Sequence, residues 1–300
     1  MKSFFCLVKR NVTLFFKDKG MLLPSLITPI ILLVLYVTFL GKVYKDGFLS
    51  NLPENMDVNA LGDLVDGVVG GQLISSLLAV STVTVAFCSN LIMVQDKFTG
   101  ARKDMLVTPV SKNTISLAYY FGTLINTLVI SLIATAAGLI YLGIIGFYLS
   151  VGDVFLLILD VFLVAMFGTV LSSIVNTFLS TQGQMSAVGT IVSAGYGFIC
   201  GAYMPISNFS DGLKNFFSVL PGTYGTSLIR NHCLEGCFRK MDELGLPSEA
   251  IEGIKESVDC RISFFGNDVP VYMMYLILIG SILLLMGIYV FINLRRRKVD

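Results

Sequence analysis

The feature that most constrains this chain is a long stretch without a charged residue, from residue 113 to residue 152. A membrane-spanning helix needs about 20 mostly apolar residues, because each residue advances about 1.5 Å along the axis. Composition points the same way, since 55% of the 300 residues are hydrophobic and 14% are charged, whereas soluble domains carry about 25% charged residues. The sequence therefore predicts an all-α membrane protein, because a helix satisfies its own backbone hydrogen bonds in lipid.

Six apolar stretches are long enough to cross a bilayer. They cover residues 20–41, 71–94, 113–150, 154–179, 184–203 and 269–294. None of them shows the alternating polarity of transmembrane β-strands. The first follows a long charged lead and has no clean cleavage site, so we expect it to be retained as a signal-anchor helix. We therefore predict one six-span transmembrane domain over residues 20–294.

The positions of lysine and arginine predict the orientation. These residues are enriched on the cytoplasmic side of membrane proteins, and here they gather in residues 1–19, 95–112 and 295–300. With six spans the three segments fall on one side. The acid-rich segments 42–69 and 208–268 fall on the other side. The number of spans thus agrees with the charge distribution, and five or seven spans would break this agreement. We expect a multi-pass protein of the cell membrane with both termini, including the tail 295–300, in the cytoplasm.

The charged lead, residues 1–19, is itself patterned. Its apolar residues recur at helical spacing with basic residues between them: Phe4, Phe5, Val8, Val12, Phe15 and Phe16. This pattern predicts an amphipathic helix on the inner membrane surface. The alternative is a disordered basic lead that only sets the topology.

Residues 204–268 form a second irregular stretch. Pro205, Gly212, Pro221 and Gly222 interrupt apolar residues near its start, which favours short re-entrant or interfacial helices on the outer side. We expect an extracellular polar loop from about residue 231 to residue 268, with a short amphipathic helix over residues 241–258.

The sequence offers little for enzyme catalysis, and we predict no catalytic residue. The only histidine, His232, falls in the expected outer loop, where a lone histidine is more often a surface residue than a catalyst. No GxxxxGK[ST] phosphate loop is present, and no His/Cys/Asp cluster has the spacing of metal ligands. The formal net charge of +1 argues against a nucleic-acid partner.

Asp160 is the one acidic residue inside an expected span. Carboxylates within a membrane are costly and often functional, so Asp160 could belong to a substrate path or a gate. It could also reach the headgroup layer or a wet cavity from its place near the outer end of the span.

Three cysteines fall in the expected outer loop. An oxidising exterior would permit one disulfide, joining Cys260 to Cys233 or Cys237; in the alternative all three are reduced. Hydroxyl and amide side chains are also frequent in the spans 71–94 and 184–203, including Ser186, Thr190 and Ser193 of the latter. They serve helix packing or, in the more polar span 71–94, the lining of a pathway.

The cytoplasmic segment 95–112 carries a resemblance to a known family. From Asp96 it reads DKFTGARKDMLVTPVSK and resembles the coupling segment of type-2 ABC exporter permeases. The matching residues are Asp96, Gly100, Leu106, Pro109, Val110, Ser111 and Lys112. The stretches GAYMPIS, from Gly201, and LPGTYGTSLIR, from Leu220, also resemble the family, so the resemblance covers nearly the whole chain. One departure is Gln95, where an acidic residue often stands.

The resemblance implies a transport subunit and not an enzyme. It implies a dimer with a second permease, identical or homologous, and contact with a separate ABC ATPase that binds ATP and magnesium; this chain itself would bind no cofactor. The expected ATPase contacts are Asp96, Lys97, Gly100, Arg102, Lys103, Asp104, Met105, Leu106 and Pro109. The expected outer gate or re-entrant residues are Met204, Pro205, Pro221 and Tyr224.

The apolar path implied by this resemblance suits a hydrophobic or amphipathic cargo, such as a drug, a peptide or a lipid-like molecule, exported across a bacterial plasma membrane. Polysaccharide is another cargo within the superfamily. Two other classes stay open from the residues alone: a membrane-embedded acyl- or phospho-transferase, and a membrane sensor whose outer loop binds a ligand.

Overall fold

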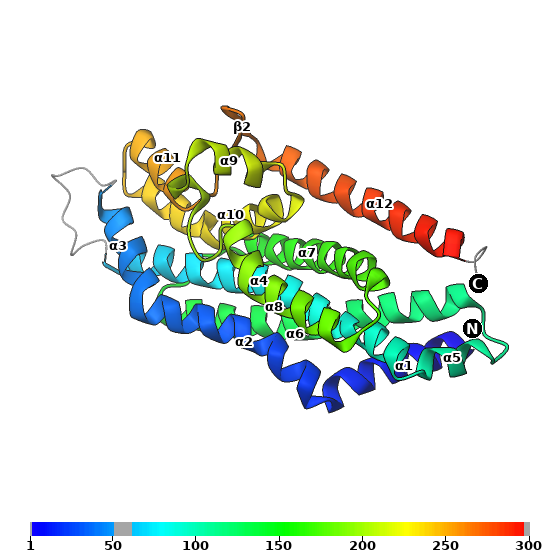
Figure 1. Ribbon diagram of the computed structural model, residues 1–300. Helices are drawn as coiled ribbons and strands as arrows, with labels where there is room; N and C mark the ends of the chain where they lie inside the picture. The colour runs from blue at the N-terminus through cyan, green and yellow to red at the C-terminus, as the bar shows by residue number, and fades with distance from the viewer. Residues whose placement is uncertain (1, 51–61, 297–300) are drawn as a thin grey trace.

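A computed structural model describes residues 2–50 and 62–296, and nearly all of them are helical (Figure 1). The elements are α1 (Lys2–Lys17), α2 (Lys19–Leu35), a π-helical turn η1 (Tyr36–Leu40), α3 (Gly41–Ser50), α4 (Gly62–Phe98), α5 (Ala101–Leu106), α6 (Lys112–Ile145), α7 (Val151–Phe178), α8 (Gln182–Ile199), η2 (Ile206–Asn208), α9 (Asp211–Ser218), α10 (Pro221–Glu243), α11 (Ser248–Ser257), β1 (Ile262–Phe264), β2 (Asn267–Val269) and α12 (Val271–Arg296).

Five helical segments of the described chain are long and apolar enough to cross a bilayer, and they confirm a multi-pass membrane protein. They are Lys19–Leu49, Gly62–Phe98, Lys112–Ile145, Val151–Phe178 and Val271–Leu294. The prediction of six spans is not confirmed. The stretch expected at 184–203 forms α8, which lies beside α4 but carries Gln182, Gln184 and several serines and glycines. It is therefore less apolar than the other five.

The long helices run roughly side by side, so the bundle has two ends (Figure 1). One end holds α5, the start of α1 and the end of α12, and we refer to it as the α5 end. The other holds α3, α10 and α11, and we refer to it as the α11 end. The beginning of the chain and its last long helix therefore reach the same end of the bundle.

The centre of the bundle is α4, which packs against α2, α6, α7, α8 and α10. Its polar side chains bond to those of neighbouring helices: Thr82 lies 3.0 Å from the Ser131 hydroxyl, and the Asn90 amide donates to Ser173 at 2.9 Å. These contacts join helices, as hydroxyl and amide groups often do within membranes. These polar residues of the span expected at 71–94 thus serve helix packing, and a lining role for the others stays a prediction.

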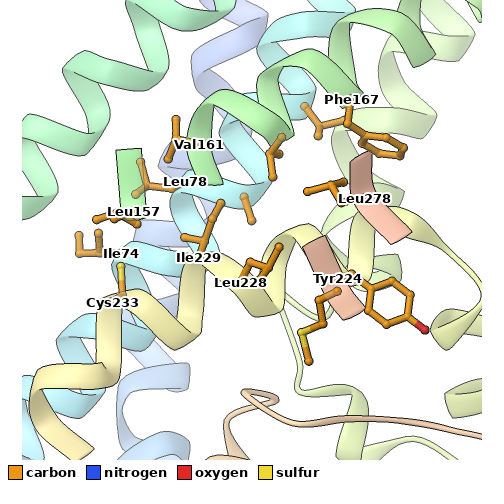
Figure 2. Close-up of a cluster of buried hydrophobic side chains, with 14 of the residues drawn as sticks. Ile74, Leu78, Leu157, Val161, Phe167, Tyr224, Leu228, Ile229, Cys233 and Leu278 are labelled. Atoms are coloured by element: carbon orange, nitrogen blue, oxygen red, sulfur yellow. The ribbon is translucent and has the colours of Figure 1, made fainter. Parts of the chain in front are cut away.

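The main hydrophobic core lies between α4, α7, α10 and α12 (Figure 2). The labelled side chains come from all four helices: Ile74, Leu78, Leu157, Val161, Phe167, Tyr224, Leu228, Ile229, Cys233 and Leu278. Lipid tails are as apolar as these side chains, so within a bilayer the side chains stabilise the bundle mainly through van der Waals packing. Because α10 contributes four of these residues, it is part of the bundle and not a surface loop.

The α11 end has its own apolar core. Its largest members come from α3, α4, α10 and α11: Phe48, Leu64, Leu234, Phe238, Met241 and Ile254. The prediction of a polar loop from residue 231 is therefore wrong for residues 231–243, which continue α10. Pro221 begins that helix at a position where a missing backbone N–H costs nothing. The short helix expected within 241–258 is present as α11.

Gly236 allows α10 to pack closely against the connection between α6 and α7. A Cβ atom placed there would lie 2.1 Å from the carbonyl oxygen of Tyr148. We predict that Gly236→Ala lowers the free energy of unfolding by about 1–3 kcal/mol, the usual cost of overpacking. Thermal unfolding of the purified protein in detergent measures the effect.

The matched control is Gly47→Ala on α3, where, among the described residues and apart from the helix's own backbone, nothing lies within 4 Å of the added carbon. That variant should be neutral or slightly stabilising, because alanine is the better helix former. Equal destabilisation by the two variants would show that the close approach of α10 at Gly236 is not what matters.

Candidate functional site

The α5 end presents a short helix that projects from the bundle. Gly100 lies between α4 and α5, immediately before the first residue of α5. Its φ of +89° is in the left-handed region that favours glycine. Lys103, Asp104 and Leu106 are exposed on α5, and Val107 beyond it is 87% exposed. The turn thus combines both signs of charge with uncovered apolar side chains, a surface typical of a protein-binding site.

The remaining expected contact residues divide between this surface and the bundle. Pro109 is exposed and Arg102 is half-buried. Met105 points back toward the bundle, where it packs against a cluster that includes Phe15 and Tyr119. Met105 therefore holds α5 in place and does not form the exposed face.

Asp96 lies inside the bundle and not on the exposed face of the turn, and its expected contact with an ATPase stays a prediction. It is 4% exposed, and the Arg10 guanidinium donates to its two oxygens at 2.6 and 2.8 Å. The Tyr119 hydroxyl donates to the same carboxylate at 2.6 Å. The hydrogen bond that Arg10 donates to Asp96 raises the pKa of Arg10. Burial lowers this pKa, but the hydrogen bond outweighs it. One carboxylate thus joins α1, α4 and α6 directly below the projecting turn.

Lys97 is also directed into the protein and not toward a partner. Its ammonium group donates to the carbonyl oxygens of Asn176, Thr177 and Leu179 at 2.8, 2.8 and 2.7 Å. These carbonyls belong to the end of α7, where the helix dipole favours a positive charge. Lys97 therefore fixes the end of α4 to the end of α7, and its contact with an ATPase stays a prediction.

The sequence reasoning missed Arg10 and Tyr119. From the sequence, Arg10 was interpreted as one of several basic residues that set the membrane topology. No local pattern distinguishes it from Lys9, because its partner is 86 positions away. Tyr119 is one tyrosine in an apolar span, and only the fold brings it to Asp96.

A groove runs between α2 and α8, with α4 at its base. Its volume is about 610 Å³. Pro24, Ile27 and Ile31 of α2 form an apolar wall, whereas Ser186, Gly189, Thr190 and Ser193 of α8 form a wall of small and hydroxylated side chains. The groove therefore suits a molecule that is mostly apolar with a few hydrogen-bonding groups.

The GAYMPIS and LPGTYGTSLIR stretches meet at Arg230, which is 1% exposed. Its guanidinium donates to Asp259 at 3.0 Å, to Ser76 of α4 at 3.2 Å and to the carbonyl oxygen of Gly201. Asp259 in turn accepts the backbone N–H groups of Ile206 and Ser207. A buried ion pair thus ties the connection after α8 to α4 and α10.

The four residues expected at an outer gate differ in exposure. Met204 is exposed, Pro205 and Tyr224 are buried, and Pro221 is half-buried at the start of α10. The Tyr224 hydroxyl donates to the carbonyl oxygen of Ser218 at 2.5 Å. Their role in gating stays a prediction, but the sequence reasoning had not identified Arg230 and Asp259, which organise this region.

His232 and Asp160 form a buried pair, so the expectation of a surface histidine is wrong. The His232 Nδ1 atom lies 2.5 Å from Asp160, whose other oxygen accepts a hydrogen bond from Tyr275 at 2.6 Å. Asp160 is fully buried among the described residues. Burial lowers the pKa of His232, but the hydrogen bond and charge of Asp160 outweigh it, and the net direction is upward. The pair joins α7, α10 and α12.

The three cysteines proposed for a disulfide, Cys233, Cys237 and Cys260, are free thiols in the structure. All three are buried, and burial raises the pKa of Cys237 and of Cys260 to about 12. They are therefore protonated and poorly nucleophilic. Within residues 2–50 and 62–296, no group of three or more His, Cys, Asp or Glu could hold a metal ion.

The first prediction from the site concerns Arg10. Replacing it with alanine leaves the buried Asp96 carboxylate without its countercharge, and a charged hydrogen bond is worth about 1.5–3 kcal/mol. We expect Arg10→Ala to lower the unfolding temperature in detergent. Lys9→Ala, which removes an exposed charge from the same helix, should have little effect; similar losses for both would contradict the assigned role of the pair.

The second concerns pH. Because the folded pKa of His232 is raised, its pairing with Asp160 contributes fully below the ordinary histidine value of 6.5 and is lost as pH rises through the raised value. We expect the unfolding temperature to fall across that range. His232→Gln removes the only imidazole of the chain and should flatten this dependence. An unchanged pH profile in the variant would refute the pairing.

Comparison with known families gives one result. The family model described as ABC-2 type transporter matches residues 2–233. That range includes the α5 turn, the groove between α2 and α8, and the first half of α10. No curated protein matches the sequence.

Proposed function

Because the chain belongs to the ABC-2 type transporter family, and is thus a membrane-spanning permease, we propose that it is one half of an ATP-driven exporter. Members of this family normally work with an ATPase subunit. The ATPase is a separate protein that binds ATP and magnesium, and a second permease, of the same or a homologous sequence, completes the transporter. In this assignment the α5 end faces the cytoplasm and the α11 end faces outward, in accord with the distribution of lysine and arginine.

The observation that carries this proposal is the exposed turn at α5. Lys103 and Asp104 offer charges of both signs to an ATPase, and Leu106 and Val107 offer apolar side chains that would be desolvated on binding. Such residues at the centre of an interface often contribute about 2 kcal/mol or more each. The turn is well placed to transmit force, because Met105 and the Asp96–Arg10 pair join its base to the bundle.

The groove between α2 and α8 supports a path for the cargo. For a helix in lipid, α8 is polar and rich in glycine. Its residues Gly183, Ser186 and Thr190 are exposed. Polar groups in a membrane normally face a partner helix or a water-filled space. In the proposed transporter the second permease faces α8, and the path lies between the two chains.

The composition of the groove favours a cargo class. Its α2 wall is apolar, and its α8 wall offers hydroxyl groups without a charged side chain. A hydrophobic or amphipathic molecule, such as a drug, a peptide or a lipid-like compound, fits this surface better than a strongly charged one. Export is the proposed direction.

The test of the proposal is binding of an ABC ATPase encoded beside this chain. We expect Leu106→Asp combined with Val107→Asp to weaken the complex at least about tenfold, because tenfold corresponds to only about 1.4 kcal/mol. Titration of the ATPase onto the permease in lipid nanodiscs measures the affinity, and ATP hydrolysis by the complex gives a second readout.

Leu244→Asp is the matched control. Leu244 is also an exposed leucine, 49% accessible, but it lies beyond the end of α10 at the α11 end. That variant should bind the ATPase as the parent does. Unchanged binding by the α5 variant, or equal loss by both, would refute the α5 turn as the site of ATPase contact.

A further inference from the structure

The β1–β2 hairpin ends in two exposed aromatic rings. Its strands pair Phe264 with Asn267, which leaves Phe265 and Gly266 as a two-residue turn with φ of +48° and +85°. Turns with two positive φ values normally take Asn, Asp or Gly, and a bulky residue is strained there. Phe264 and Phe265 are nevertheless 42% and 61% exposed, with their rings 4.9 Å apart. The fold thus accepts strain to present both rings to the surroundings.

The hairpin lies next to the end of a membrane-spanning helix. β2 has three residues and is followed by Pro270 and α12. At about 3.3 Å per residue, the five steps from Gly266 to Val271 place the turn within roughly 17 Å of that helix. The first turn of α12 exposes Tyr272 at 66%, and the same helix exposes Leu276 and Leu283 farther along. The exposed rings therefore directly precede, along the chain, a candidate membrane-spanning helix with uncovered apolar side chains.

A second element contributes to the same surface. α9 packs against β1, and Figure 1 shows α9 and the hairpin together beside the start of α12. α9 is amphipathic: Leu213 and Phe216 are 45% and 58% exposed, while Asp211 and Lys214 supply charge. We refer to Phe216, Phe264, Phe265 and Tyr272 as the aromatic rim.

We propose that the aromatic rim inserts into the headgroup layer of the bilayer at the α11 end. Aromatic side chains are favoured at that depth, and an amphipathic helix lies in the same layer with its apolar face toward the acyl chains. The continuity with α12 identifies the occupant as lipid. The rim fixes the depth of α9 and of the hairpin relative to the spanning helices. Insertion of the rim requires only a bilayer, so this proposal goes beyond the proposed export function.

The absence of tryptophan from this chain permits a direct test. Phe265→Trp and Phe216→Trp each introduce a single fluorophore, and each protein is placed in nanodiscs of phosphatidylcholine brominated either near the carbonyl end or near the methyl end of the acyl chains. We expect blue-shifted emission, stronger quenching by the shallow bromines than by the deep ones, and weak quenching by iodide. Unfolding temperatures near that of the parent show that the variants fold.

Leu244→Trp is the control, since Leu244 is exposed at the α11 end far along the chain from α12. Its emission should be quenched by iodide and by neither lipid. If the two rim variants behave like this control, the rim lies in water and the proposal is wrong. If they are shielded from iodide and from both lipids, a protein covers the rim, and the proposal is also wrong.

Discussion

The polar helix at the centre of the bundle, α4, constrains the rest of the structure, because several of its buried amide and hydroxyl groups bond to side chains of neighbouring helices. Water is not available there to bond to unpaired groups. Asn90 therefore bonds to Ser172 and Ser173 of α7, and Ser89 accepts from Asn126 of α6. The positions of α6 and α7 follow from these contacts together with the apolar packing around them.

The same helix carries a charge interaction at one end and another near its middle. At the α5 end Asp96 binds Arg10, and near the middle of α4 Ser76 accepts a hydrogen bond from Arg230. Removing one member of a buried charged pair is usually far more costly than the pair's net contribution. α4 thus connects the turn proposed to meet the ATPase with the region formed by the GAYMPIS and LPGTYGTSLIR stretches. Held at these two points, α4 would carry a displacement of α5 into the bundle.

The sequence was sufficient for features that depend on local composition. Uncharged stretches predicted the membrane class, and Gly100 followed by a mixed polar and apolar turn predicted the exposed part of α5. It was insufficient where partners lie far apart in the chain. Asp96 resembled a surface charge, and His232 resembled a surface residue of a polar loop. His232 pairs with Asp160, and only the fold reveals that contact.

The central claim is that α5 couples an ATPase to the membrane bundle. It is tested most directly by replacing residues 100–109 with a flexible glycine–serine linker and measuring ATP hydrolysis by the ATPase in nanodiscs that contain the altered chain. The account predicts that the permease still folds in the membrane, while the stable complex and its permease-dependent hydrolysis are both lost. A folded variant that retains the complex and the hydrolysis would contradict it.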